Sequence, residues 1–175
     1  MELSHSALII IDLQVGITKV VKESYPISIN KVLDKNRVLI DLFSRYNLPI
    51  YMVVVAPKIF PRKLKKAFTK ELLLEQMKEH SNILRLVKHG PSAFTQSTYG
   101  LESELKKKKI ENVYITGVST SNGVYKTGID SNKAGFNTYV IVDATADKDK
   151  VNYDTAVNEL IPKIGTIIKV EDLIE

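Results

Sequence analysis

The stretch Asn112–Thr127 constrains the fold most strongly, because it joins an apolar run, a tight polar turn and the start of a helix. Residues 113–116 predict a short buried strand, and Gly123 falls in the first turn of the helix that follows. At such a junction in an α/β sheet, unpaired backbone N–H groups of the helix face the cleft above the strand ends. These groups can polarise a carbonyl group or hold an anion, so we expect a ligand site here.

The rest of the chain alternates short apolar runs with helical patterns. The predicted strands lie at residues 7–11, 50–55, 83–87, 113–116, 138–142 and 166–170, and the predicted helices at about 30–46, 98–105, 123–135 and 151–163. This alternation predicts a parallel sheet with right-handed crossovers and helices on both faces. We therefore expect one α/β domain over residues 1–175, with a three-layer, doubly wound and mostly parallel sheet of about six strands.

Two segments carry further structural expectations. Residues 63–80 are rich in Lys and Glu and predict an exposed, mostly helical excursion. The helix after Gly123 carries a stripe of small residues that should let it lie close to the sheet, namely Thr127, Gly128, Ser131 and Gly135. A short helix before the central strand should present Thr98, Leu101 and Leu105 on one face.

Charged residues follow three of the predicted strands, namely Asp12, Lys88 and Asp143. Because the carboxyl ends of parallel strands form one rim, we expect them near the turn at 117–123. An acid at the end of a buried strand is costly to desolvate unless it is paired, and Lys88 is the natural partner of Asp12. For each residue alone, a capping or salt-bridge role is the alternative. We interpret Asp143 in that way, as a residue that organises the loop before the last helix.

The composition excludes several chemistries. The chain contains no cysteine, so disulfides, thiolate metal sites and cysteine nucleophiles are ruled out. The three histidines, His5, His80 and His89, are far apart and show no metal-ligand spacing. We expect neither a protein-bound metal nor a cofactor.

The formal net charge of +5 is modest, and much of it lies in the runs 62–66 and 106–109. No aromatic residues alternate with these cations, so we interpret both runs as solvent-exposed helix surface and expect no nucleic-acid partner. No apolar run approaches a membrane span, and the first residues lack the pattern of a signal peptide. The expectation is a cytoplasmic protein with no membrane partner.

Three blocks of the sequence resemble signature blocks of the isochorismatase-like hydrolases. They are residues 10–14 (Ile-Ile-Asp-Leu-Gln), 88–94 (Lys-His-Gly-Pro-Ser-Ala-Phe) and 117–127, which begins Gly-Val-Ser-Thr-Ser-Asn-Gly. The similarity continues through 142–144 to the end of the chain, and only residues 56–82 lack a counterpart. The resemblance implies an isochorismatase-like version of the Rossmann-like fold, a small-molecule substrate and a homo-oligomer, dimeric or higher.

The resemblance also implies roles for individual residues. In the amidase members of the family, which include nicotinamidases, the residue matching Asp12 acts as a base and the residue matching Lys88 supports it. Their nucleophilic cysteine falls at the position of Gly123, so a covalent acyl-enzyme is not available here. Family members also place a cis peptide where this chain has Val118–Ser119, which turns N–H groups toward the substrate. Other residues expected at the pocket are Gln14, Phe94, Thr120 and Asn122.

A second branch of the family matches glycine at position 123 better. Isochorismatases hydrolyse a vinyl ether, and their Asp protonates the enol-ether carbon before water captures the cation. Such a general acid needs a raised pKa, which burial favours and Lys88 opposes. The Asp-x-His metal spacing of nicotinamidases is missing, since residues 56–60 read Ala-Pro-Lys-Ile-Phe, and residues 15–17 replace an aromatic of the family. Both departures argue against nicotinamide as the substrate.

Three interpretations therefore stand. The first is a cofactor-free hydrolase that uses Asp12 as general acid or base together with Lys88. The second is a catalytically inactive relative that serves as a small-molecule-binding or assembly module, because loss of the nucleophile is also what degeneration produces. The third is a nucleotide-binding Rossmann protein, which is weakened because no Gly-x-Gly-x-x-Gly motif follows the first strand.

Overall fold

A parallel sheet of six strands forms the centre of the computed structural model, which describes residues 3–21, 23–95 and 97–174. The strands are β1 (Ser6–Ile11), β2 (Ile50–Val55), β3 (Ile83–Lys88), β4 (Asn112–Val118), β5 (Asn137–Ala146) and β6 (Thr166–Ile168). Their order is β3-β2-β1-β4-β5-β6, and all five neighbouring pairs are parallel. This order reverses between β1 and β4, which is the switch point where ligands bind in doubly wound sheets. The predicted α/β class is confirmed.

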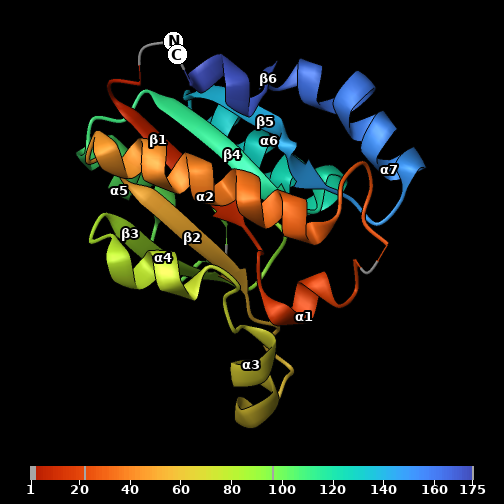
Figure 1. Cartoon of the computed structure of the whole chain (residues 1–175). Coiled ribbons are helices and arrows are strands. Elements are labelled where there is room, and N and C mark those ends of the chain that lie inside the picture. Colours follow the sequence, from red (N-terminus) through yellow and green to blue (C-terminus); the bar gives the residue numbers. More distant parts are fainter. Residues whose placement is uncertain (1–2, 22, 96, 175) are drawn as a thin grey trace.

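Helices cover both faces of the sheet (Figure 1). The α-helices are α1 (Val15–Thr18), α2 (Ile29–Arg45), α3 (Arg62–Phe68), α4 (Leu74–Glu79), α5 (Leu101–Lys107), α6 (Tyr125–Lys133) and α7 (Lys150–Thr155). The π-helical turns are η1 (Thr120–Val124) and η2 (Ala156–Leu160), and the 3₁₀ turns are η3 (Ile161–Lys163) and η4 (Val170–Leu173). Helix α2 crosses one face of the sheet, whereas α5 and α6 lie behind the other.

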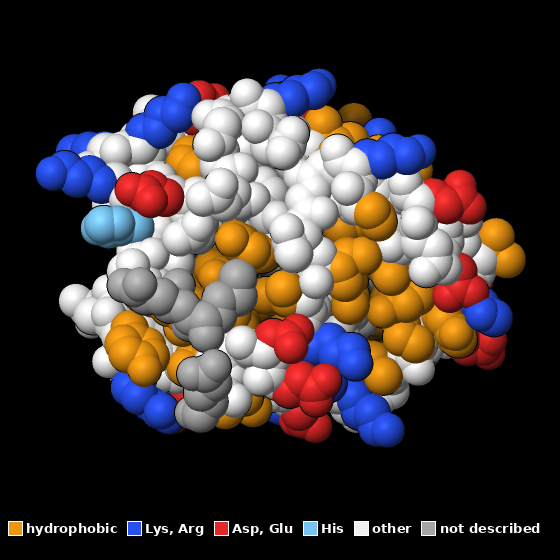
Figure 2. Space-filling view, turned by 90° about the horizontal axis from the view of Figure 1, so that it is seen from above, with side chains coloured by type: hydrophobic (Ala, Val, Ile, Leu, Met, Phe, Trp, Pro, Cys, Tyr) orange, Lys and Arg blue, Asp and Glu red, His pale blue; other side chains and the backbone are white. Residues whose placement is uncertain are grey.

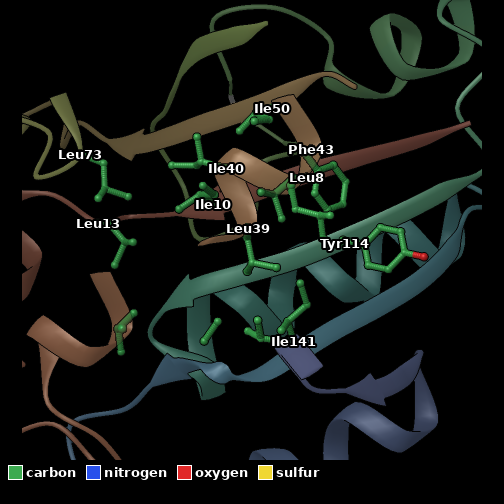
Figure 3. Close-up of a cluster of buried hydrophobic side chains, with 14 of the residues drawn as sticks. Leu8, Ile10, Leu13, Leu39, Ile40, Phe43, Ile50, Leu73, Tyr114 and Ile141 are labelled. Carbon is green, nitrogen blue, oxygen red and sulfur yellow. The ribbon is translucent and has the colours of Figure 1, made fainter. Parts of the chain in front are cut away.

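Each face of the sheet has its own apolar core. Leu8 and Ile10 of β1 belong to the cluster under α2, together with Phe43 and Tyr114 (Figure 3). The alternate residues of β1, among them Ile9, pack in the cluster on the α5 and α6 side. Because successive side chains of a strand point to opposite faces, a strand buried on both faces must be apolar throughout. All six residues of β1 are accordingly buried.

Three details of the sequence prediction are wrong. Strand β5 continues to Ala146, because the pairing register shifts between Ile115 and Gly117 and lets the ends of β4 and β5 pair again. Asp143 therefore lies within β5 and not at its end. Gly135 lies beyond α6 with φ of 89°, so it forms the C-terminal turn instead of the small-residue stripe. Thr98 precedes α5, and its N–H donates to Val87 at 2.8 Å.

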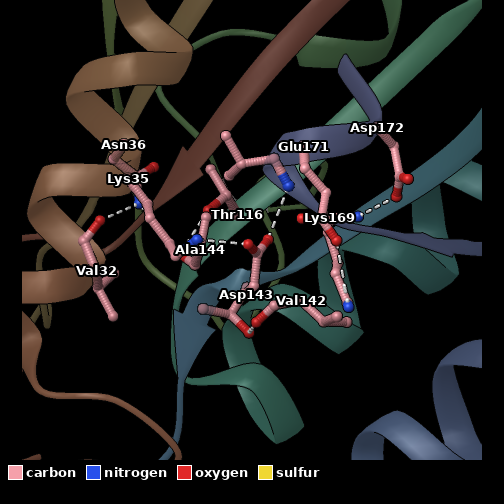
Figure 4. A network of polar contacts seen from close by, with 12 residues as sticks. Val32, Lys35, Asn36, Thr116, Val142, Asp143, Ala144, Lys169, Glu171 and Asp172 are labelled. Carbon is pink, nitrogen blue, oxygen red and sulfur yellow. Dashed lines mark hydrogen bonds and ion pairs between the residues drawn. The ribbon is translucent and has the colours of Figure 1, made fainter. Parts of the chain in front are cut away.

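Asp143 links helix α2 to the end of the chain (Figure 4). Its Oδ2 lies 2.6 Å from Lys35 Nζ, and its Oδ1 accepts a hydrogen bond of 2.9 Å from Val170 N–H. Nearby, the buried Asn36 amide donates to the carbonyl of Ala144 at 3.1 Å. Asp143 is thus a structural residue, as expected, but it fixes α2 and η4 and not the loop before the last helix.

One face of the molecule carries a group of hydrophobic side chains at its surface. Seen from above, hydrophobic side chains gather on the right half of the molecule, and charged side chains lie mostly around them (Figure 2). Among the described residues, no helix combines the length and the hydropathy that a membrane span requires. The homo-oligomer and the cytoplasmic location stay predictions.

We predict that Asp143→Ala lowers the free energy of unfolding by about 1–2 kcal/mol, because it removes a charge-assisted hydrogen bond and leaves Val170 N–H without its acceptor. Urea denaturation provides the measurement. The matched control is Asp34→Ala, which removes an exposed ion pair with Arg37 in the same helix α2 and should cost less than about 0.5 kcal/mol. Equal losses in the two variants would contradict the structural role of Asp143.

Candidate active site

The chain leaves β1 at Asp12 with a left-handed backbone conformation. Asp12 has φ of 53°, a region that Asp adopts more readily than most residues. Its N–H donates to the carbonyl of Val53 at 2.9 Å, and its own carbonyl accepts from Gln14 N–H at 2.8 Å. The backbone on both sides of Asp12 is therefore fixed at the edge where the strand order reverses.

Lys88 meets Asp12 from the end of β3. Its Nζ lies 2.9 Å from Asp12 Oδ2 and donates a further hydrogen bond of 2.6 Å to the carbonyl of Pro91. The two side chains are only 1% (Lys88) and 7% (Asp12) exposed, so they form a desolvated ion pair. The structure thus brings together the two charged residues that the sequence placed at separate strand ends.

Gly123 lies directly against this ion pair. A Cβ atom built on Gly123 would lie 3.3 Å from Asp12 Oδ2 and 3.3 Å from Lys88 Nζ. It would also approach Ile11 Cγ2 to 2.8 Å, so Ile11 would have to shift. Position 123 is therefore the one from which a side chain would project onto both charges. Because residue 123 is glycine, no side chain from this position contacts Asp12 or Lys88.

The turn before Gly123 has unusual backbone geometry. The Val118–Ser119 peptide is cis, as expected from the sequence, and residues Thr120–Val124 form a π-helical turn in place of the first α-helical turn that was expected. Such turns are rare and often occur at functional sites. The turn therefore departs from a regular helix start at the position that lies against Asp12 and Lys88.

Asp147 is a residue of this region that the sequence analysis missed. It is buried, and its Oδ2 accepts a hydrogen bond of 2.7 Å from Ser121 N–H while Oδ1 accepts one of 2.8 Å from Lys148 N–H. Asp147 directly follows β5, so the rule that places site residues at strand ends would have found it. The rule selected Asp143 because β5 was predicted four residues too short.

Burial controls the protonation of Asp12. Desolvation raises its pKa to about 6 and outweighs the nearby Lys88 ammonium, which acts to lower it. The second carboxyl oxygen, Oδ1, is also buried and has no hydrogen-bond partner. An ionised carboxylate would satisfy such an atom with a donor, whereas a protonated carboxyl needs fewer donors. Asp12 can therefore hold and release a proton close to neutral pH.

The other residues expected at the pocket have different surroundings. The Gln14 amide is occupied by the main chain, because it donates to Val55 and Phe68 carbonyls and accepts from Val55 N–H at 2.7 Å. Thr120 is buried and donates to Thr145 Oγ1 at 2.9 Å. Phe94 is half-buried and packs near Phe136, and Asn122 is exposed. Gln14 and Thr120 thus have internal partners.

Metal-ligating side chains do not gather in the structure. Among residues 3–21, 23–95 and 97–174, no three or more His, Cys, Asp or Glu side chains are placed so that they could hold a metal ion. The nearest histidine in sequence to Lys88, His89, contacts the carbonyl of Ala56 through Nδ1 at 2.7 Å.

Fold and site together define an α/β protein of the doubly wound class with a buried Asp12–Lys88 ion pair at its topological switch point. The model of the isochorismatase domain matches residues 6–172. The chain therefore belongs to the isochorismatase family, and hydrolases of several kinds share its fold.

Individual relatives support this assignment. The chain is 24% identical over 183 residues to the uncharacterized isochorismatase family protein YecD of Escherichia coli O157:H7, covering 97% of this chain and 94% of that protein. An isochorismatase family protein from Burkholderia thailandensis has a similar structure, with a TM-score of 0.83, 24% identity and coverage of 96% and 93% of the two chains. The nicotinamidase from Staphylococcus aureus superposes with a TM-score of 0.74 at 20% identity, covering 95% and 98% of the two chains.

We predict that Lys88→Met raises the pKa of Asp12 above the value of about 6, because it removes the cation that opposes the effect of burial. The carboxyl carbon of Asp12 can be followed by NMR during a pH titration. Lys35→Met is the matched control, since Lys35 pairs with Asp143 and not with Asp12. An unchanged or lower pKa of Asp12 in Lys88→Met would contradict the proposed electrostatics.

Proposed function

We propose that this protein is a hydrolase that activates a small-molecule substrate by protonation, with Asp12 as the general acid and without a covalent enzyme intermediate. The observation that supports it most directly is the raised pKa of Asp12, about 6, in a carboxyl group whose Oδ1 has no partner. General acids work best when their pKa lies near the operating pH. The vinyl ethers hydrolysed by isochorismatases are the substrate class that fits this chemistry.

The proposed reaction needs three contributions from the chain. Asp12 donates its proton to the enol-ether carbon, which leaves a cation that water captures. The resulting hemiketal then breaks its C–O bond to give a ketone and an alcohol, and a proton returns to Asp12. Lys88 lies 2.9 Å from Asp12 and stabilises the carboxylate that forms after proton transfer. Glycine at position 123 is the third contribution, because it leaves room for the substrate beside Asp12 Oδ2 and Lys88 Nζ.

The absence of a side chain at position 123 fits this route. A covalent mechanism would need a nucleophile beside Asp12 and Lys88, and the Cβ direction of residue 123 is the one that reaches both. The chain has no cysteine, and a glycine cannot supply a nucleophile. Water is then the nucleophile that remains, and Gly123 leaves the ion pair free of an additional side chain.

The pH dependence of the rate tests the acid role. With a pKa of about 6, Asp12 is mostly protonated below pH 6, and about a tenth of it is protonated at pH 7. We predict that kcat/KM for a vinyl-ether substrate falls about tenfold per pH unit above that pKa. A general base would give the opposite slope, with a rate that rises through the same pH range. A rising limb near pH 6 would therefore contradict the proposal.

Substrate specificity and Asp12→Asn separate the remaining alternatives. The wild type should turn over isochorismate in preference to nicotinamide or small ureido compounds, and Asp12→Asn should lose that activity because an amide cannot donate the proton in the same way. The alternative from the sequence, a binding module, predicts no turnover of any of these compounds and unchanged binding by Asp12→Asn. Calorimetric titration of both proteins measures that binding.

We predict that Gly123→Ala lowers kcat/KM by at least about tenfold, because its methyl group would stand 3.3 Å from both charged atoms and crowd the substrate. The control is Gly100→Ala, whose added Cβ would meet mainly the exposed Ser103 hydroxyl at 2.9 Å, and whose activity should be unchanged. Thermal unfolding of both variants shows whether the fold is retained. Full activity in a folded Gly123→Ala protein would exclude a reacting position beside residue 123.

A further inference from the structure

The segment 58–70, which we call the α3 protrusion, extends away from the body of the molecule below the sheet (Figure 1). It contains a turn at residues 58–60 followed by α3. Its base is fixed, because Gln14 donates to the carbonyl of Phe68 at 3.1 Å and Val15 N–H donates to that of Lys70 at 2.9 Å. The position of its tip is thus set by hydrogen bonds at its base.

The α3 protrusion concentrates the positive charge of the chain. Two grooves that share Lys63, Lys66 and Thr69 run along it, with volumes of ≈ 570 and ≈ 600 Å³. Their charged lining residues are Arg62, Lys63, Lys65, Lys66, Lys70, Glu71 and Arg85. These six cations and one anion give a formal charge of +5, the same as the formal net charge of the whole chain. The remaining residues are therefore neutral on balance.

The second basic run of the sequence has a different environment. On α5, Lys106 pairs with Glu102, and Lys108 lies 3.4 Å from Glu104. In the grooves of the α3 protrusion the single acid, Glu71, pairs with Arg85. Among the described residues, no acid lies within ion-pair distance of the lysines of α3. Two runs that look alike in sequence thus differ in whether their charge is neutralised.

Apolar side chains stand among these cations. Ile59 is 88% exposed and Leu64 is 59% exposed, whereas Phe60 turns inward and packs edge to face against Phe68 with ring centroids 5.1 Å apart. Ile59 is the most exposed of the large hydrophobic side chains in the described chain. Exposed single apolar residues between lysines and arginines combine the two attractions that hold proteins on anionic bilayers.

We propose that the α3 protrusion binds the surface of an anionic lipid bilayer, with its cations on the lipid phosphates and with Ile59 and Leu64 inserted between headgroups. Nucleic acid would use the cations but leaves the two apolar side chains without a role, and no aromatic side chain is exposed there for base stacking. The core of a protein interface is depleted of charged side chains, whereas here lysines and arginines surround the two apolar side chains. A bilayer surface accepts isolated apolar side chains, and its negative charge complements the +5 of the grooves.

This proposal departs from the expectation that the basic runs are solvated helix surface without a membrane partner. It is independent of the proposed reaction, because none of its residues belongs to the site at Asp12 and Lys88. Peripheral binding of this kind requires no spanning helix.

The test measures sedimentation of the full chain with phosphatidylcholine vesicles, with and without phosphatidylglycerol, at low and at physiological ionic strength. The wild type should bind only the vesicles that contain phosphatidylglycerol, and more weakly as salt is added. Lys63→Gln combined with Lys66→Gln should weaken binding about 25-fold, or about fivefold per lysine. The control, Lys107→Gln with Lys133→Gln, removes the same charge from other helices and should bind like the wild type.

The apolar contribution is tested separately with Ile59→Ser combined with Leu64→Ser. This variant should bind the same vesicles at least about fivefold more weakly. Val151→Ser with Ile174→Ser, which changes exposed apolar residues elsewhere, should have no effect. Failure of the wild type to bind anionic vesicles, or equal binding by the serine variant and the wild type, would overturn the proposal. Binding of single-stranded RNA that is lost in the lysine variant, without vesicle binding, would show a nucleic-acid surface in its place.

Discussion

The buried ion pair between Asp12 and Lys88 is the interaction on which the candidate site depends. Two ionisable side chains that are 7% and 1% exposed can coexist only if each offsets part of the desolvation of the other. The compensation is incomplete on the side of Asp12, since burial still raises its pKa to about 6 and Oδ1 has no donor. A well-compensated pair would keep the pKa of the acid far below neutral pH, whereas here about a tenth of Asp12 is still protonated at pH 7. The incomplete one gives Asp12 a proton to donate.

The neighbourhood of this pair limits which reactions are available. In the geometry of this fold, residue 123 is the position that faces both charges, and here it has no side chain. The site therefore holds Asp12 and its partner Lys88, and by the resemblance to the amidases it lacks their nucleophile. This combination supports the proposed route, in which protonation is followed by attack of water, over covalent catalysis. Position 123 and the pKa of Asp12 thus support the same route from independent observations.

Much of the fold could be predicted because most of its strands are runs of apolar residues. The run that ends at Ile11 is apolar throughout because it is covered on both faces. Such a strand can be recognised in the sequence without knowing which strands pair with it. The errors in the predicted strand ends occur where the length of a strand depends on its pairing with a neighbouring strand. Strand β5 continues past Asp143 because β4 pairs with it again after a register shift, and the sequence around Asp143 gives no sign of that shift. Asp147, which accepts a hydrogen bond from Ser121 N–H, was missed for the same reason.

The sequence by itself determined that Asp12, Lys88 and Gly123 would lie at one edge of a parallel sheet, because strand ends in this topology share a rim. It also determined that no cysteine could act there. The tertiary structure decided the balance between burial and the Lys88 charge, because desolvation depends on every element packed around the pair. The tertiary structure also decided that, among the described residues, the basic run at 106–109 is paired with acids whereas the run at 62–66 is not. The acids that accompany Lys106 and Lys108 come from the same helix, whereas the charge of α3 depends on what the fold places beside it.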